Sequence, residues 1–124
     1  PLLRVNLGQT LIALPDNDKI DEGIGELKKS LVQDEENSAA WRLLAEAYDR
    51  RGQDGLARYA TAEYNFQEGD KRQALIFAMR AREMLAKGSP EWRRATDIVL
   101  ASNPDKALTR DINRDYGDMG SGGR

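Results

Sequence analysis

Helix-breaking residues divide this sequence into segments of helical length, and this division limits the folds that the chain can adopt. Within each segment apolar residues recur every three or four positions, as at Ala74, Ala78 and Ala81, which places them on one face of a helix. No segment alternates polar and apolar residues over a useful length, so strands are not expected. Proline, glycine and clustered acidic or amide residues separate the segments. The predicted helices span residues 1–14, 18–33, 38–51, 54–67, 71–86 and 90–101.

Small residues lie on these apolar faces, where bulky side chains would hold neighbouring helices apart. They let helix axes approach to within about 8–10 Å. Helices this short are only marginally stable alone, so their stability must come from stacking against one another. The sequence therefore predicts an all-α fold of about six antiparallel helices. The small residues that carry this prediction are Gly8, Ala45, Ala57, Ala62, Ala74 and Ala78.

A spaced pattern of large and small residues runs through the third and fourth segments, at Trp41, Leu44, Ala45, Tyr48, Gly52 and Ala57. This order resembles the signature of tetratricopeptide repeats (TPRs), which recur about every 34 residues. The resemblance implies a TPR-like α-solenoid over residues 1–101. The residues expected to define its core are Gly8, Trp41, Leu44, Ala45, Tyr48, Ala57, Ala74 and Trp92.

The repeat shows a half-step in its register. Gly69 lies half a TPR period after Gly52 instead of a full one. We therefore expect the helix over residues 54–67 to close one repeat and open the next. Ala60 and Ala62 are small enough for that helix to face neighbours on both sides. The helix from residue 90 is then an incomplete hairpin that caps the stack.

The C-terminal region, residues 102–124, fits no repeat. A weak charged helix is expected from Pro104 to about Arg114. The stretch over residues 117–124 is rich in glycine and is expected to be disordered. The prediction is thus a helical repeat domain over residues 1–101 and a charged, mostly disordered tail over residues 102–124.

Six stretches carry a more specific resemblance: residues 3–11, 20–24, 27–31, 40–45, 67–70 and 88–92. Their order is similar to the C-terminal TPR region of bacterial BepA-like zinc metallopeptidases. That resemblance implies a periplasmic location, a separate N-terminal peptidase domain with an H-E-x-x-H zinc helix, and outer-membrane-protein substrates or assembly machinery as partners. The chain has no histidine, so no zinc ligand can be assigned to it. We expect a non-catalytic fragment of a longer protein.

TPR proteins bind partners in a groove lined by the first helix of each repeat. Arg42, Arg50, Asn6 and Gln9 are then donors to a partner's backbone or carboxylates, although solvated helix surface explains the same pattern. Tyr64 borders the groove in this interpretation. Trp41 and Trp92 are interpreted as core residues and not as binding anchors. The predicted groove residues are Asn6, Gln9, Arg42, Glu46, Asp49, Arg50 and Tyr64.

Composition excludes several other functions. The 19 basic and 21 acidic residues are spread along the chain, which argues against nucleic acid and anionic membranes as partners. The absence of cysteine and histidine removes thiolate ligands and the commonest general base. The acidic residues between Asp16 and Glu22 lack the glycine and bidentate glutamate of a calcium loop. No metal or cofactor site and no membrane span are expected.

Two functions remain from the sequence. The first is a protein-interaction module whose expected polypeptide partners are its own N-terminal peptidase domain and outer-membrane-protein substrates. The alternative is a purely structural region that positions or caps the peptidase domain. An independent hydrolase is not expected, because neither histidine nor cysteine is present.

Overall fold

The computed structural model describes residues 2–122, with the side chains described through residue 115, and that part of the chain is all-helical. The predicted all-α class is confirmed, and the six predicted helices are present with ends shifted by a few residues. None of the described helices has the length and apolar character needed to cross a membrane. The helices are α1 (Leu2–Ile12), α2 (Asn17–Gln33), α3 (Ser38–Arg50), α4 (Asp54–Gln67), α5 (Lys71–Met84), α6 (Pro90–Ala101) and α7 (Lys106–Gly122).

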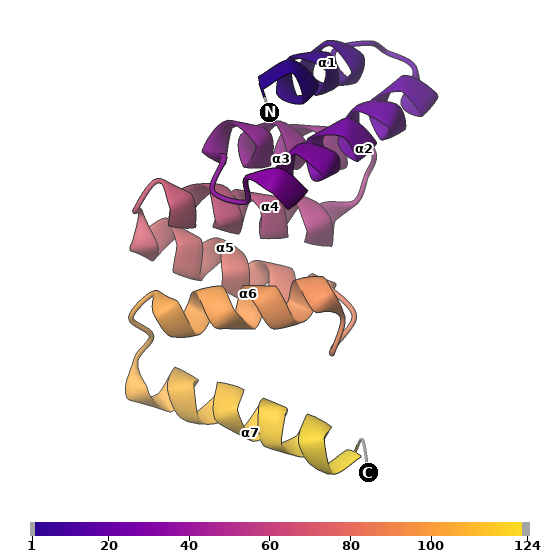
Figure 1. Cartoon of the computed structure of the whole chain (residues 1–124). Coiled ribbons are helices and arrows are strands. Elements are labelled where there is room, and N and C mark those ends of the chain that lie inside the picture. The colour runs from indigo at the N-terminus through magenta and orange to yellow at the C-terminus, as the bar shows by residue number, and fades with distance from the viewer. Residues whose placement is uncertain (1, 123–124) are drawn as a thin grey trace.

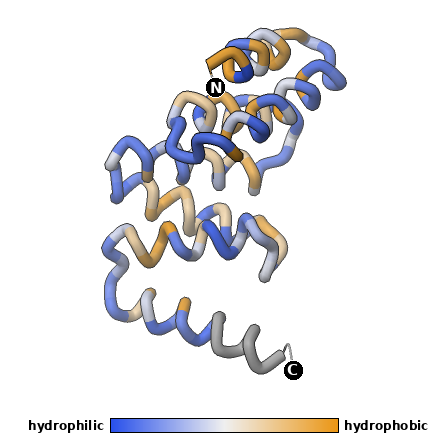
Figure 2. The backbone as a smooth tube through the Cα atoms, viewed as in Figure 1, coloured by the Kyte–Doolittle hydropathy of each residue, from blue (hydrophilic) through white to orange (hydrophobic). Residues whose placement is uncertain are grey.

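Consecutive helices lie next to one another in chain order and run in alternating directions (Figure 1). Helix α4 packs closely against α3 on one side and α5 on the other, so its predicted two-sided packing is confirmed. Helix α6 packs on α5 and also reaches α4. Hydrophilic residues occupy the α4–α5 and α6–α7 turns, at the edge of the stack (Figure 2).

The turns before and after α4 share one hydrogen-bond pattern. The Gln53 N–H donates to the Tyr48 carbonyl, and the Asp70 N–H donates to the Asn65 carbonyl, each over 2.9 Å. This is the Schellman motif, which needs a residue with positive φ. Gly52 and Gly69 supply it, with φ of 71° and 82°. The half-period spacing between Gly52 and Gly69 therefore arises because the same type of turn precedes and follows α4.

Two apolar clusters meet at α4. The first lies among α1, α2, α3 and α4, and includes Ala57 and Ala60. The second lies among α4, α5, α6 and α7, and includes Ala62. All three alanines are completely buried, and Tyr59 packs against both clusters. Helix α4 thus joins two halves of the core through fully buried alanines and the partly buried Tyr59.

The region beyond residue 101 differs from the mostly disordered tail predicted for residues 102–124, because residues 106–122 form α7. The Asp105 carboxylate accepts a hydrogen bond from the Leu108 N–H over 2.8 Å at the start of this helix. Ile112 is completely buried in the second cluster, and Asp115 pairs with Arg82 over 3.0 Å. Burial of one isoleucine and an ion pair to α5 give α7 a tertiary anchor that composition does not reveal. Residues 123–124 lie outside the described part.

Glycines set the distance between α1 and α2. A Cβ atom on Gly23 would lie 2.7 Å from Ile12 Cγ2 and 3.0 Å from the Gly8 carbonyl oxygen. A Cβ atom on Gly8 would lie 2.7 Å from Leu27 Cγ. These separations are shorter than van der Waals contact, so the two helices can only pack this closely if both residues lack a side chain. Gly25, in the same helix, has open space around it.

Replacing Gly23 by alanine is expected to lower the free energy of unfolding by about 1–2 kcal/mol, because α1 must move away from α2. Gly25→Ala is the matched control in the same helix. It is expected to raise stability by about 0.5–1 kcal/mol, since alanine favours a helix and meets no neighbour there. Urea unfolding monitored by circular dichroism measures both. Equal effects of the two substitutions would contradict the close approach at Gly23.

Candidate binding cleft between α2 and α6

A cleft of about 430 Å³ opens between α2 and α6, over α3 and α4. Its volume falls in the range of about 300–1,000 Å³ that is common for ligand sites. The walls come from helices that are far apart in the sequence, so the cleft exists only in the stacked fold. The residues that line it are Lys28, Leu31, Val32, Glu35, Trp41, Leu44, Tyr48, Tyr59, Glu63, Glu91 and Arg94.

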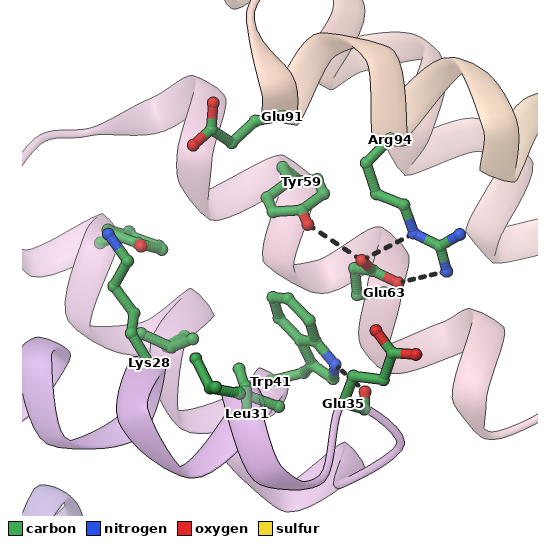
Figure 3. A pocket seen from close by; sticks show the side chains of 11 residues that line it. Lys28, Leu31, Glu35, Trp41, Tyr59, Glu63, Glu91 and Arg94 are labelled. Carbon is green, nitrogen blue, oxygen red and sulfur yellow. Dashed lines mark hydrogen bonds and ion pairs between the residues drawn. The ribbon is translucent and has the colours of Figure 1, made fainter.

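Aromatic rings line the inner part of the cleft. The Trp41 and Tyr59 rings meet edge to face, with centroids 5.6 Å apart and an interplanar angle of 83°. The Trp41 indole N–H donates to the Glu35 carbonyl over 2.8 Å, which ties α3 to the end of α2 (Figure 3). Trp41 is buried, yet part of its ring borders the cleft. The rings therefore form a rigid surface held from two helices.

A buried ion pair joins α4 to α6 at the side of the cleft. The Glu63 side chain is 5% exposed, and its two oxygens accept hydrogen bonds from Nε and a terminal nitrogen of Arg94, each at 3.0 Å (Figure 3). The Tyr59 hydroxyl donates to the same carboxylate over 2.9 Å. The hydrogen bond to Glu63 raises the pKa of the Arg94 guanidinium. The bidentate pair neutralises the Glu63 charge and fixes its orientation.

Tyr48 presents a polar group that the fold leaves unused. Its side chain is buried, with 6% of the residue exposed, and it lines the cleft. Within residues 2–115 no group hydrogen-bonds the Tyr48 hydroxyl. Burial raises the pKa of Tyr48 to about 12, and the negative charge of Glu91 adds to the shift. Burial also raises the pKa of Tyr59, helped by the negative charge of Glu63.

The rim of the cleft carries charged and apolar side chains. Glu91 from α6 and Lys28 from α2 lie on opposite sides of the opening, with Glu35 at the end of α2 (Figure 3). No ion pair connects these three side chains in the part of the chain whose side chains are described. Val32 is 87% exposed beside them. The mouth of the cleft therefore combines unpaired charges with an exposed apolar edge.

The groove predicted from the sequence lies elsewhere. Arg50 donates to the backbone carbonyls of Ile12 and, over 3.1 Å, of Leu14, so it holds the end of α1. Asp49 pairs with Arg58 over 3.7 Å. Tyr64 is half-buried against the first cluster. The remaining four residues are exposed: Asn6, Gln9, Arg42 and Glu46.

None of these seven residues lines the cleft. Helical spacing explains why, because Arg42 and Glu46 lie on the side of α3 opposite to Trp41 and Tyr48. Arg50 and Asp49 are engaged within the chain itself. A partner-binding role for the exposed residues of α1 and α3 stays a prediction.

The residues expected to define the core are where the sequence places them. Seven are buried: Gly8, Trp41, Leu44, Tyr48, Ala57, Ala74 and Trp92. Ala45 is partly buried and packs against the first cluster. Trp92 is covered by the Arg82 guanidinium, 4.7 Å from its ring centroid. Both tryptophans are buried, and Trp41 also borders the cleft.

The sequence alone did not predict that polar residues of α4 and α6 would come together at the cleft. Glu63 and Arg94 are separated by 31 positions, and each looks like an ordinary charged residue of a helix surface. The sequence offered one indication. Because α4 was expected to pack between two neighbouring helices, an acidic residue on α4 was a candidate for burial. Comparison with protein-family models, curated proteins and solved structures finds no match to this chain.

Removing Arg94 is expected to destabilise the protein, since the Glu63 carboxylate would stay buried without its partner. Arg94→Ala should cost about 3 kcal/mol in urea unfolding, the lower end for a broken buried pair because Arg94 is partly exposed. Glu63→Gln combined with Arg94→Met should restore most of that loss, because no buried charge remains and Tyr59 keeps an acceptor. A cost for Arg94→Ala no larger than that of the exposed Arg42→Ala would contradict this role.

The raised pKa of Tyr48 predicts a loss of stability in alkali. The fold favours the neutral phenol, so its contribution is complete below the ordinary pKa of 10.0 and disappears as pH rises through about 12. Urea unfolding measured across this pH range is expected to show a smaller alkaline loss in Tyr48→Phe than in the wild type. Parallel pH dependences in the two proteins would show that Tyr48 ionises equally in the folded and unfolded states.

Proposed function

We propose that this chain is a TPR-like helical repeat module that binds a partner polypeptide in the cleft between α2 and α6 and catalyses no reaction itself. The sequence resemblance to the TPR signature and the packing of helices in chain order support the repeat architecture. The cleft is the observation that carries the binding function.

Three properties of the cleft favour a polypeptide as its occupant. Aromatic rings from α3 and α4 offer a rigid contact surface, of the kind enriched at binding hot spots. The Tyr48 hydroxyl, on a ring that is otherwise buried, is accessible to an occupant and makes no hydrogen bond to a described residue. Val32 and Leu31 extend the apolar surface out of the cleft along α2, so an occupant longer than one side chain gains contact.

The resemblance to BepA-like peptidases extends the proposal to a biological setting. In this setting the module lies in the periplasm beside a zinc peptidase domain and presents outer-membrane-protein substrates, or assembly machinery, to it. This extension is supported by the order of the sequence stretches that resemble BepA-like peptidases, which include the glycine turns, Trp41 and Trp92. The chain contains neither histidine nor cysteine, which fits a binding role beside a separate catalytic domain.

An observation on α1 favours the structural alternative as a second function. One face of this helix packs on α2, while Leu3 and Leu7 on its outer face are 81% and 47% exposed. Leu2 and Leu14 are also exposed. A helix or domain that covers these leucines would be positioned by α1. This surface is separate from the cleft, so both functions are compatible with one fold.

Val32→Ser tests the binding function, because Val32 is exposed and the substitution removes an apolar contact at the cleft mouth without changing its charge or disturbing the core. Overlapping peptides from outer-membrane β-barrel proteins are titrated by fluorescence polarisation against the wild type, Val32→Ser and Arg42→Glu. Peptides that bind the wild type are expected to bind Val32→Ser about tenfold more weakly, which corresponds to about 1.4 kcal/mol.

Arg42→Glu is the matched control on the opposite side of α3, and it should bind like the wild type. Loss of binding in Arg42→Glu with normal binding in Val32→Ser would move the site to the groove predicted from α1 and α3. If no peptide binds the wild type, the interaction function is wrong and the positioning function of α1 becomes the better explanation.

A further inference from the structure

The chemistry of the cleft indicates which kind of side chain it accepts. Five charged residues line it, but the Glu63 charge is cancelled by the bidentate contact with Arg94. Two carboxylates remain, on Glu35 and Glu91, against a single ammonium group on Lys28. The cleft therefore has an excess of negative charge at its mouth.

The walls favour a cation as well. The faces of tyrosine and tryptophan rings attract positive charge through their π electrons. Trp41, Tyr48 and Tyr59 all border the cleft, and the last two experience the Glu91 charge, which contributes to raising the pKa of each hydroxyl. Glu91 is thus electrostatically close to the aromatic surface, although it belongs to a different helix.

Tyr48 adds a hydrogen-bonding group to the cleft. Its residue is mostly buried, it lines the cleft, and its hydroxyl has no hydrogen-bond partner among the described side chains and backbone groups. The fully buried side-chain atoms without a partner in the described part are Ser30 Oγ and Ser102 Oγ, so the Tyr48 hydroxyl itself is accessible and an occupant can contact it. A neutral tyrosine hydroxyl accepts a hydrogen bond from an ammonium or guanidinium group.

From these contacts we infer that the cleft binds the side chain of a lysine or arginine from the partner polypeptide. The aliphatic part of that side chain lies against Leu31 and the aromatic rings, and its charged end lies between Glu91 and the Tyr48 hydroxyl. This inference rests on the proposed function and specifies the residue that the cleft selects.

Lys28 has a defined part in this proposal. It is exposed, makes no ion pair with a described side chain, and stands at the mouth with Glu91 on the other side (Figure 3). Its ammonium group is a competing cation of this chain itself. Removing its charge should strengthen binding of an external cation, whereas a site for anions would be weakened by the same change.

The experiment uses n-butylammonium as a lysine side-chain probe, with n-butanol and butyrate as neutral and anionic probes of similar size. Binding is followed by ¹H–¹⁵N NMR on the full chain. The Trp41 indole N–H, which lies at the cleft, reports binding, and the Trp92 indole, which packs against Arg82 and does not line the cleft, serves as an internal reference. Shifts of the Trp41 signal are expected with n-butylammonium and not with butyrate.

The variants are Glu91→Gln, Lys28→Met and the control Glu46→Gln, which removes a carboxylate from the opposite side of α3. Glu91→Gln should weaken n-butylammonium binding about threefold, and Lys28→Met should strengthen it by a similar factor. Glu46→Gln should change nothing. Circular dichroism confirms that each variant is folded.

Two outcomes would overturn the inference: a Trp41 shift with butyrate in preference to n-butylammonium, or n-butylammonium binding that is unchanged in Glu91→Gln. Peptides that bind the cleft in a Val32-dependent manner without any preference for lysine or arginine would also overturn it, and would leave the proposed function intact. Binding of n-butylammonium without binding of any polypeptide would instead count against the proposed function alone.

Discussion

The buried alanines of α4 determine how closely the neighbouring helices can pack, and the arrangement of the stack follows from that packing. Ala57 and Ala60 face α3, and Ala62 faces the second cluster, all without exposed area. Since the fully buried side chains of α4 at these contacts are methyl groups, α3 and α5 can both lie close to the same helix. Residues of α4 between the two contact faces are then directed to a third side, where Tyr59 and Glu63 form part of the cleft. The close packing of α4 against α3 and α5 therefore directs Tyr59 and Glu63 into the cleft.

The cleft also depends on how α6 is held. The Glu63–Arg94 pair connects α4 to α6, and Arg94 lies over the Phe66 ring at 5.6 Å from its centroid. A buried ion pair of this kind adds little net stability but is costly to break, so it fixes the relative placement of the two helices. Glu91 lies one helical turn before Arg94 on α6. The position of Glu91 at the cleft mouth is therefore set by the same contact.

The fold was largely predictable from the sequence, whereas the cleft was not. Helical periodicity and glycine turns locate six helices, and small residues such as Gly8 and Ala57 identify the contact faces. These signals are local, with partners within one helix or the next. Glu63, Arg94 and Lys28 acquire their roles from neighbours far along the chain, and in sequence they look like solvated helix residues. Helix α7 was expected only as a weak helix ending near Arg114, and its attachment to the stack was not predicted. The buried Ile112 and the Arg82–Asp115 pair that attach it depend on residues far apart in the sequence.

The central claim is that a partner polypeptide occupies the face of the stack between α2 and α6. Site-specific photo-crosslinking tests this most directly, with p-benzoylphenylalanine placed at position 32 or at position 42 of the full chain in cells. A cross-link to a bound polypeptide is expected from position 32, beside the cleft, and none from position 42. A partner cross-linked from position 42 alone would place binding on the other face of α3, away from the cleft, and would show that the cleft is not the binding site.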